Sequence, residues 1–114
     1  MNLEAIITNT PLDSKSRARL ARLVSDARVE HRAYSFDHLV KEIEPASPEA
    51  LSLAMTALVD NGVVERVLRV ESPSGRGGVQ DFRNLDEIPD ELADWRTETR
   101  WRVRPEDILV IYKF

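Results

Sequence analysis

The sequence predicts an α+β fold, and residues 47–70 indicate it most directly. A helical pattern in this stretch stops at Asn61-Gly62 and is followed at once by a valine-rich run that is typical of a strand. Helical spacings dominate the part of the chain before it, and short apolar runs recur after it. The chain has 114 residues, which predicts one domain over residues 1–114.

The helix predicted to begin at residue 48 has a signal at each end. Ser47 is placed to cap its N-terminus, and Pro48 occupies the first turn, where a missing N–H costs nothing. Gly62 supplies the left-handed residue that commonly ends a helix, and residues 63–71 then form a strand. The inward stripe of the helix consists of Leu51, Ala54, Met55 and Leu58.

The N-terminal part of the chain predicts a short strand followed by a long helix. Residues 3–8 are apolar and short enough for a strand. Thr10 and Pro11 offer an N-cap and a first-turn proline, so a helix is expected over residues 11–30. Its inward side comprises Leu12, Ser16, Leu20, Leu23, Val24 and Ala27.

A second helix is predicted over residues 36–43, capped by Ser35 and preceded by a brief extended segment at residues 33–34. Tyr34 and Leu39 have the spacing of a hydrophobic staple. After the third helix and its strand, the glycine-rich loop 72–78 leads to a partner strand at residues 79–83.

This order of elements resembles the winged helix-turn-helix superfamily. The resemblance covers the core at residues 11–83 and rests on the helix-to-strand junction LVDNGVVERV. It implies three helices with a β-hairpin wing, in which residues 47–61 take the place of the recognition helix and residues 73–78 form the tip of the wing. Fold alone implies little about function.

Residues 84–114 extend this core with further strands. Residues 84–89 predict a turn, and 90–95 a loop or a single helical turn. Residues 97–104 alternate, with Trp101 and Val103 on one side and the arginines on the other. Residues 105–107 break this strand, and 108–112 predict a buried one that pairs either with residues 3–8 or with the sheet of the wing.

Composition excludes several classes of protein. The absence of cysteine excludes a disulfide framework, and no apolar run is long enough to span a membrane or to serve as a signal peptide. We therefore expect a cytoplasmic protein without a membrane partner. The net charge of −4 disfavours a non-specific nucleic-acid binder, and residues 35–62 are the acidic part, with five acids and one base.

No catalytic or metal-ligating set emerges from the motifs. His31 and His38 lack the accompanying ligands of a zinc site, and no serine lies in a nucleophile motif. Residues 74–78 are rich in glycine but lack the ending of a phosphate-binding loop and precede a strand, so a hairpin loop is the better interpretation. We expect neither an enzyme nor a bound cofactor.

The resemblance to winged helices implies a DNA-binding transcriptional regulator whose partner is double-stranded DNA. Ser52 and Thr56 would then face the groove, and Arg66, Arg69 and Arg76 the phosphates. A secondary basic surface would consist of Arg100, Arg102 and Arg104. The alternative for all of these arginines is pairing with nearby acids on a solvated surface.

A second functional hypothesis follows from the predicted recognition helix itself. Residues 47–60 contain no Arg, Lys, Asn or Gln, although these side chains dominate base reading and phosphate contacts. The alternative function is a protein-interaction module, an adaptor or a subunit of a larger complex, without intrinsic DNA binding. Either function is compatible with a homodimer.

Overall fold

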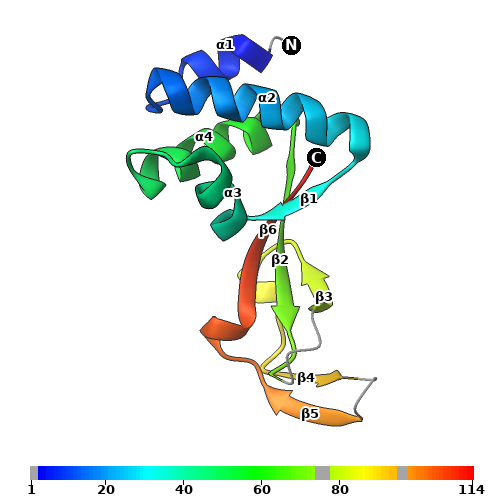
Figure 1. Cartoon of the computed structure of the whole chain (residues 1–114). Coiled ribbons are helices and arrows are strands. Elements are labelled where there is room, and N and C mark those ends of the chain that lie inside the picture. Colours follow the sequence, from blue (N-terminus) through cyan, green and yellow to red (C-terminus); the bar gives the residue numbers. More distant parts are fainter. Residues whose placement is uncertain (1–2, 74–77, 95–97) are drawn as a thin grey trace. The chain divides into compact units, whose positions relative to one another are not determined.

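The computed structural model describes residues 3–73, 78–94 and 98–114, and it is a mixed α+β structure (Figure 1). The helices are α1 (Leu3–Thr8), α2 (Ser14–Glu30), α3 (Phe36–Ile43) and α4 (Pro48–Asp60), with short 3-10 segments η1 (Leu85–Glu87) and η2 (Pro105–Asp107). The strands are β1 (Ala33–Ser35), β2 (Glu65–Glu71), β3 (Gly78–Phe82), β4 (Glu91–Asp94), β5 (Thr99–Arg102) and β6 (Ile108–Lys113). The α+β prediction is thus confirmed.

The chain divides into two compact units. The helical unit comprises Met1–Glu65 and Tyr112–Phe114, and the strand unit comprises Arg66–Ile111. The strands follow the order β1-β6-β2-β3 in a four-stranded sheet, whereas β4 and β5 form a sheet of two. Among the described residues, no helix combines the length and the apolar composition needed to cross a bilayer.

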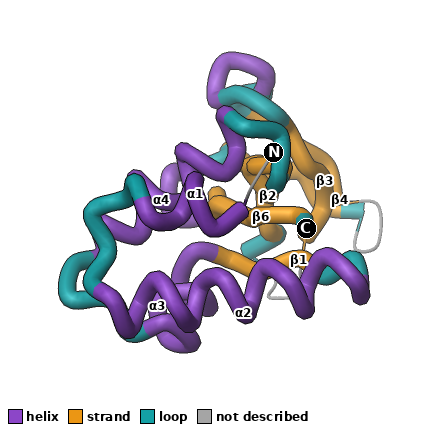
Figure 2. The backbone as a smooth tube through the Cα atoms, turned by 90° about the horizontal axis from the view of Figure 1, so that it is seen from above, coloured by secondary structure: helices purple, strands orange, loops and turns teal. Residues whose placement is uncertain are grey.

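The core of the helical unit lies between its helices. Helix α1 packs against both α2 and α4, and α2 packs against α3 (Figure 2). The predicted stripe of α4 is completely buried, because Leu51, Ala54, Met55 and Leu58 are each 0% exposed. Other buried apolar residues of this unit are Ile7, Leu12, Leu20, Val24, Ala27, Leu39, Ile43, Val64 and Tyr112.

Local caps set the ends of α3 and α4 as predicted. The Ser35 hydroxyl oxygen accepts a hydrogen bond from the His38 N–H at 3.1 Å, and that of Ser47 accepts one from the Ala50 N–H at 3.0 Å. Gly62 has a φ of 72°, the left-handed conformation expected after α4. Strand β2 then begins at Glu65, two residues later than predicted.

The prediction of a strand at residues 3–8 was wrong, and the helical count therefore rises to four within the described residues. Ile6 and Ile7 follow Leu3 at helical spacing, and Ile7 is buried where α1 meets its neighbours. A six-residue apolar run fits a strand or a helix equally well by pattern, so packing decides it. Strand β6 consequently lies beside β1 and β2, which is the second of its two predicted pairings.

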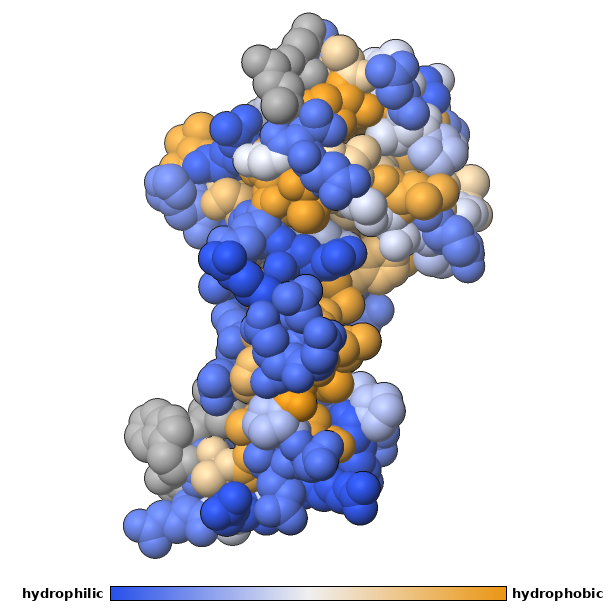
Figure 3. All heavy atoms as spheres, turned by 180° about the vertical axis from the view of Figure 1, so that it is seen from behind, coloured by the Kyte–Doolittle hydropathy of each residue, from blue (hydrophilic) through white to orange (hydrophobic). Residues whose placement is uncertain are grey.

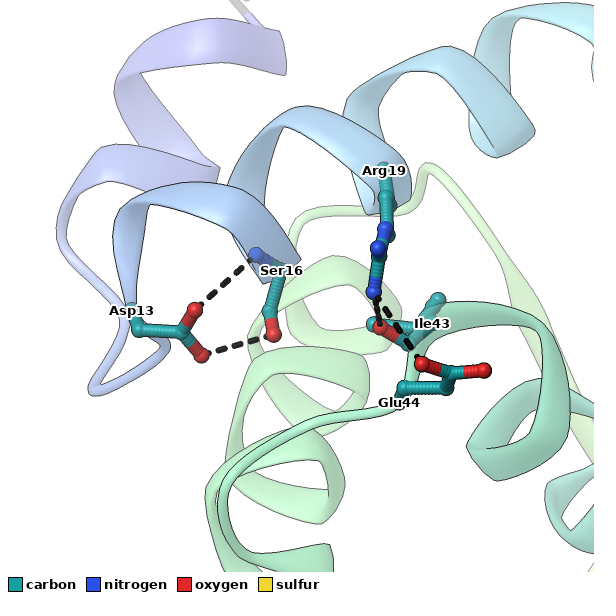
Figure 4. Close-up of polar contacts among 5 residues, drawn as sticks. All are labelled: Asp13, Ser16, Arg19, Ile43 and Glu44. Atoms are coloured by element: carbon teal, nitrogen blue, oxygen red, sulfur yellow. Dashed lines mark hydrogen bonds and ion pairs between the residues drawn. The ribbon is translucent and has the colours of Figure 1, made fainter.

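Helix α2 begins at Ser14, three residues later than predicted, because Asp13 caps it. The Asp13 carboxylate accepts hydrogen bonds from the Ser16 hydroxyl at 2.7 Å and from the Ser16 N–H at 3.3 Å (Figure 4). The Thr10 hydroxyl is instead directed at the end of α1, where it donates to the Ile7 carbonyl. The hydrogen bond from the Ser16 hydroxyl lowers the pKa of Asp13 from its ordinary value of 3.8.

One arginine joins α2 to the end of α3. The Arg19 Nη1 donates to the Ile43 carbonyl at 3.0 Å and lies 3.7 Å from the Glu44 carboxylate (Figure 4). Glu44 itself is the left-handed C-cap of α3, with a φ of 52°. Arg19 thus satisfies a carbonyl that the helix leaves without an intrahelical donor.

The strand unit contains the antiparallel pairs β2–β3 and β4–β5, and β6 also lies next to β2 in the larger sheet. Strands β2 and β3 form the predicted hairpin, with Leu68 opposite Phe82 and an irregularity between Val70 and Glu71. Strands β4 and β5 pair from Glu91 opposite Arg102 to Asp94 opposite Thr99. The predicted loop or helical turn at residues 90–95 was therefore wrong over Glu91–Asp94, where pairing with β5 stabilises a strand.

Replacing Leu58 by alanine is expected to lower the free energy of unfolding by about 2 to 5 kcal/mol, because truncation leaves a cavity in the core. Leu53→Ala on the same helix is the matched control. The Leu53 side chain is 61% exposed, so its loss should change the free energy of unfolding by less than about 0.5 kcal/mol. Urea denaturation followed by circular dichroism measures both values, and equal effects would contradict the assigned burial.

Acid stability tests the Asp13 cap. Because the pKa of Asp13 is lowered in the folded state, the stabilisation by its carboxylate is present above the ordinary value of 3.8 and is lost as pH falls through the lowered pKa. Asp13→Asn keeps a capping side chain but cannot titrate. Its urea midpoint should therefore fall less steeply than that of the wild type on acidification. If the urea midpoints of the two proteins fall equally steeply with pH, the Asp13 carboxylate contributes nothing to acid stability.

Candidate interaction surfaces

The outward face of α4 carries uncharged and acidic side chains. Its exposed residues are Glu49, Ser52, Leu53 and Asp60, and Thr56 is half-buried beside them. These positions follow the helical repeat on the side opposite the buried stripe. The face therefore offers hydroxyls, one large apolar side chain and two carboxylates, and no cation.

The two residues predicted to face a DNA groove lie together on this face. Thr56 donates its hydroxyl hydrogen to the Ser52 carbonyl of its own helix at 3.0 Å, which leaves the Thr56 oxygen as an acceptor. The Ser52 side chain is exposed. The structure thus brings Ser52 and Thr56 one turn apart, as predicted, but the donor of Thr56 is already used within the helix.

The structure describes two of the three predicted phosphate ligands, Arg66 and Arg69, both on strand β2. Arg69 donates to both Asp81 oxygens, from Nε at 2.8 Å and from Nη2 at 3.1 Å. Hydrogen bonding to Asp81 raises the pKa of Arg69 and holds its guanidinium against the neighbouring strand. Arg66 is exposed and makes no ion pair with any described residue. Arg76 lies outside the described residues.

The predicted secondary basic surface is interleaved with acids. Arg100 Nη2 lies 3.8 Å from the Glu91 carboxylate, and Arg104 Nε lies 3.4 Å from that of Glu106. Arg102 is exposed and lies opposite Glu91 in the register of β4 and β5. The alternation is as expected, since Trp101 is half-buried between exposed arginines. Nearby carboxylates nevertheless offset much of the positive charge.

A cleft of about 510 Å³ in the helical unit was not predicted from the sequence. Helix α2, Arg32 just before β1, strand β1 and helix α3 line it, and together they supply three arginines, two acids and a pair of aromatic rings. The lining residues are Arg19, Arg22, Leu23, Asp26, Arg32, Tyr34, His38 and Glu42. They come from segments up to 23 positions apart, so no local motif signals the cleft.

Side chains within the cleft hold one another in place. The Tyr34 and His38 rings are stacked, with centroids 4.9 Å apart and planes 7° from parallel. Arg32 donates from Nη1 to the Tyr34 hydroxyl at 3.1 Å and forms an ion pair with Glu30, and the bond to Tyr34 raises the pKa of Arg32. Arg22 forms no ion pair with a described residue, but Asp26 and Glu42 line the same cleft. The cleft is thus nearly balanced in charge.

Exposed large hydrophobic side chains are few within the described part of the chain. Seen from behind, hydrophobic residues reach the surface of the helical unit among polar ones (Figure 3). The most exposed large hydrophobics are Val29 at 81%, Leu85 at 66% and Leu53 at 61%. Only Leu53 lies in the interior of a long helix, since Val29 is next to the end of α2 and Leu85 begins η1.

Residues 3–73, 78–94 and 98–114 contain no group of three histidine, aspartate or glutamate side chains arranged to hold a metal ion. No family model matches the chain, and searches of curated proteins and of solved structures found no match.

The Arg69–Asp81 pair is expected to contribute to stability. A double-mutant cycle with Arg69→Met and Asp81→Asn should give a coupling energy of about 0.2 to 1 kcal/mol, as is usual for opposite charges across antiparallel strands. Arg66→Met combined with Asp81→Asn is the control and should be additive, because Arg66 makes no described ion pair. Urea unfolding measures both cycles, and additivity in the Arg69 cycle would show that the pair is not formed in solution.

Proposed function

We propose that the chain is a winged helix-turn-helix domain that binds a protein partner, as an adaptor or as a subunit of a larger complex. The order α2, β1, α3, α4, β2, β3 supports the fold assignment. Strand β6 lies between β1 and β2 and widens the sheet of the wing beyond a simple hairpin. The functional assignment depends on the kinds of side chain that α4 exposes to solvent.

The observation that carries the proposal is the outward face of α4, which contains two carboxylates and no cation or amide. A helix that enters the major groove lies between two rows of phosphates, where affinity depends on cationic side chains and base reading favours Arg, Lys, Asn and Gln. The phosphates would repel Glu49 and Asp60, and Leu53 would find little apolar surface to contact. A protein surface can instead cover Leu53 and satisfy both acids.

The engagement of the arginines supports the same conclusion. Arg69 is held by Asp81, and Arg100 and Arg104 lie close to carboxylates. Because DNA affinity grows with the number of phosphates neutralised, arginines with internal partners contribute less to it. The net charge of −4 also repels DNA at long range.

A DNA-binding regulator remains the second candidate, and one observation favours it. Arg22 and Arg66 are exposed and form no ion pair with a described residue, so their guanidinium groups are available for phosphates. In this alternative Arg66 and Arg76 would supply most of the affinity, while Ser52 and Thr56 would contact bases through hydroxyl groups.

A titration with duplex DNA separates the two candidates. Fluorescence anisotropy of a labelled duplex at low salt should show no complex with micromolar wild-type protein. The double variant Glu49→Lys/Asp60→Lys reverses both charges on α4 and should gain a weak complex that dissociates as salt is raised. A salt-sensitive wild-type complex that is weakened by Arg66→Ala would instead support the regulator.

The interaction hypothesis also needs a positive result. Affinity capture from the native host with the tagged full chain should return a partner at a fixed stoichiometry. Reconstitution of that complex from the two purified proteins would then show that the contact is direct. Absence of a stoichiometric partner, together with salt-sensitive binding of duplex DNA, would overturn the proposal.

A further inference from the structure

This inference rests on the proposed function and concerns where the partner binds and what it must look like. The centre of the exposed face of α4 is apolar. Leu53 is 61% exposed, and Ala50 and Ala57, one turn away on either side, are half-buried. Small residues flanking a large one allow another helix to approach closely, because the distance between packed helices depends on the side chains at the contact.

Acidic groups lie at both ends of this apolar centre. Glu49 stands in the first turn of α4 and Asp60 in the last, eleven residues further along. With a rise of 1.5 Å per residue, the two positions are roughly 16 Å apart along the helix axis. Glu49 accepts a hydrogen bond from the Ser47 hydroxyl, and neither carboxylate forms an ion pair with a described residue.

The charges decide between the kinds of molecule that could cover this face. Nucleic acid would place phosphates against the carboxylates. In a second copy of the chain, each acid would face its own counterpart if the helices were parallel, and Glu49 would face Asp60 if they were antiparallel. Like charges meet in either case and oppose association. A partner with positive charge avoids both conflicts.

We propose that the exposed face of α4 is a docking site for a cationic amphipathic helix of a partner protein. An apolar side chain of that helix packs against Leu53, over Ala50 and Ala57. Lys or Arg residues about three turns apart on the partner reach Glu49 and Asp60. The buried stripe and the Ser47 cap hold α4 rigid before binding, so little conformational entropy is lost on its side of the complex.

Selection from a library of displayed helical peptides tests this site directly, with the folded full chain as bait. The enriched peptides should carry an apolar centre flanked by Lys or Arg. Leu53→Asp should weaken a selected peptide by about tenfold or more, as expected for a central apolar anchor. Glu49→Lys/Asp60→Lys should weaken it similarly, and increasingly so at low salt.

The matched control is Val29→Asp, which changes an apolar residue on α2 that is even more exposed than Leu53 and should leave peptide affinity unchanged. Circular dichroism and thermal melting establish that each variant is folded. Failure to enrich any peptide, enrichment of acidic peptides, or equal binding to Leu53→Asp would each overturn the α4 site.

Binding of the partner from the native host shows whether the α4 site is wrong or the proposed function as a whole is wrong. If that partner binds wild-type protein and Leu53→Asp equally well, the chain is an interaction module and the α4 site is wrong. If the purified chain binds duplex DNA and no protein, the proposed function itself fails.

Discussion

Complete burial of one face of α4 is the constraint on which the helical unit depends. Its four inward side chains are 0% exposed, and burial of each larger one contributes about 1.5 to 3 kcal/mol. Helix α1 packs against α4, and α1 and α3 both pack against α2. Since α4 cannot rotate without exposing this stripe, the same constraint dictates which residues face outward. Burial of the inward stripe of α4 thus also fixes the outward face that we propose binds a partner.

Predictions from the sequence succeeded where the signal was local. Ser35, Ser47 and Gly62 act within a few residues of themselves, so the bounds of α3 and α4 could be read from them. The predicted start of α2 was three residues too early, because Thr10 and Asp13 can both cap a helix and Asp13 does so. Thr10 is used to close α1, a helix that had not been expected.

Predictions failed where packing against or pairing with another element decides the structure. Residues 3–8 are helical because Ile7 is buried against other helices, and Glu91–Asp94 form a strand because Thr99–Arg102 pair with them. The candidate surfaces follow the same rule. The exposed residues of α4 could be predicted from the helical repeat alone. The pairing of Arg69 with Asp81, twelve residues away, and the cleft beside Tyr34 required the three-dimensional structure.

Local energetics explain one of the two acids on α4 but not the other. Glu49 lies in the first turn, where a negative charge interacts favourably with the helix dipole and with the Ser47 hydroxyl. Asp60 lies in the last turn, where the same dipole disfavours it, and no basic residue accompanies it there. Its position therefore has no stabilising explanation within the helix. A cationic partner supplies one, since a carboxylate at the rim of an interface speeds association and orients the partner at little desolvation cost.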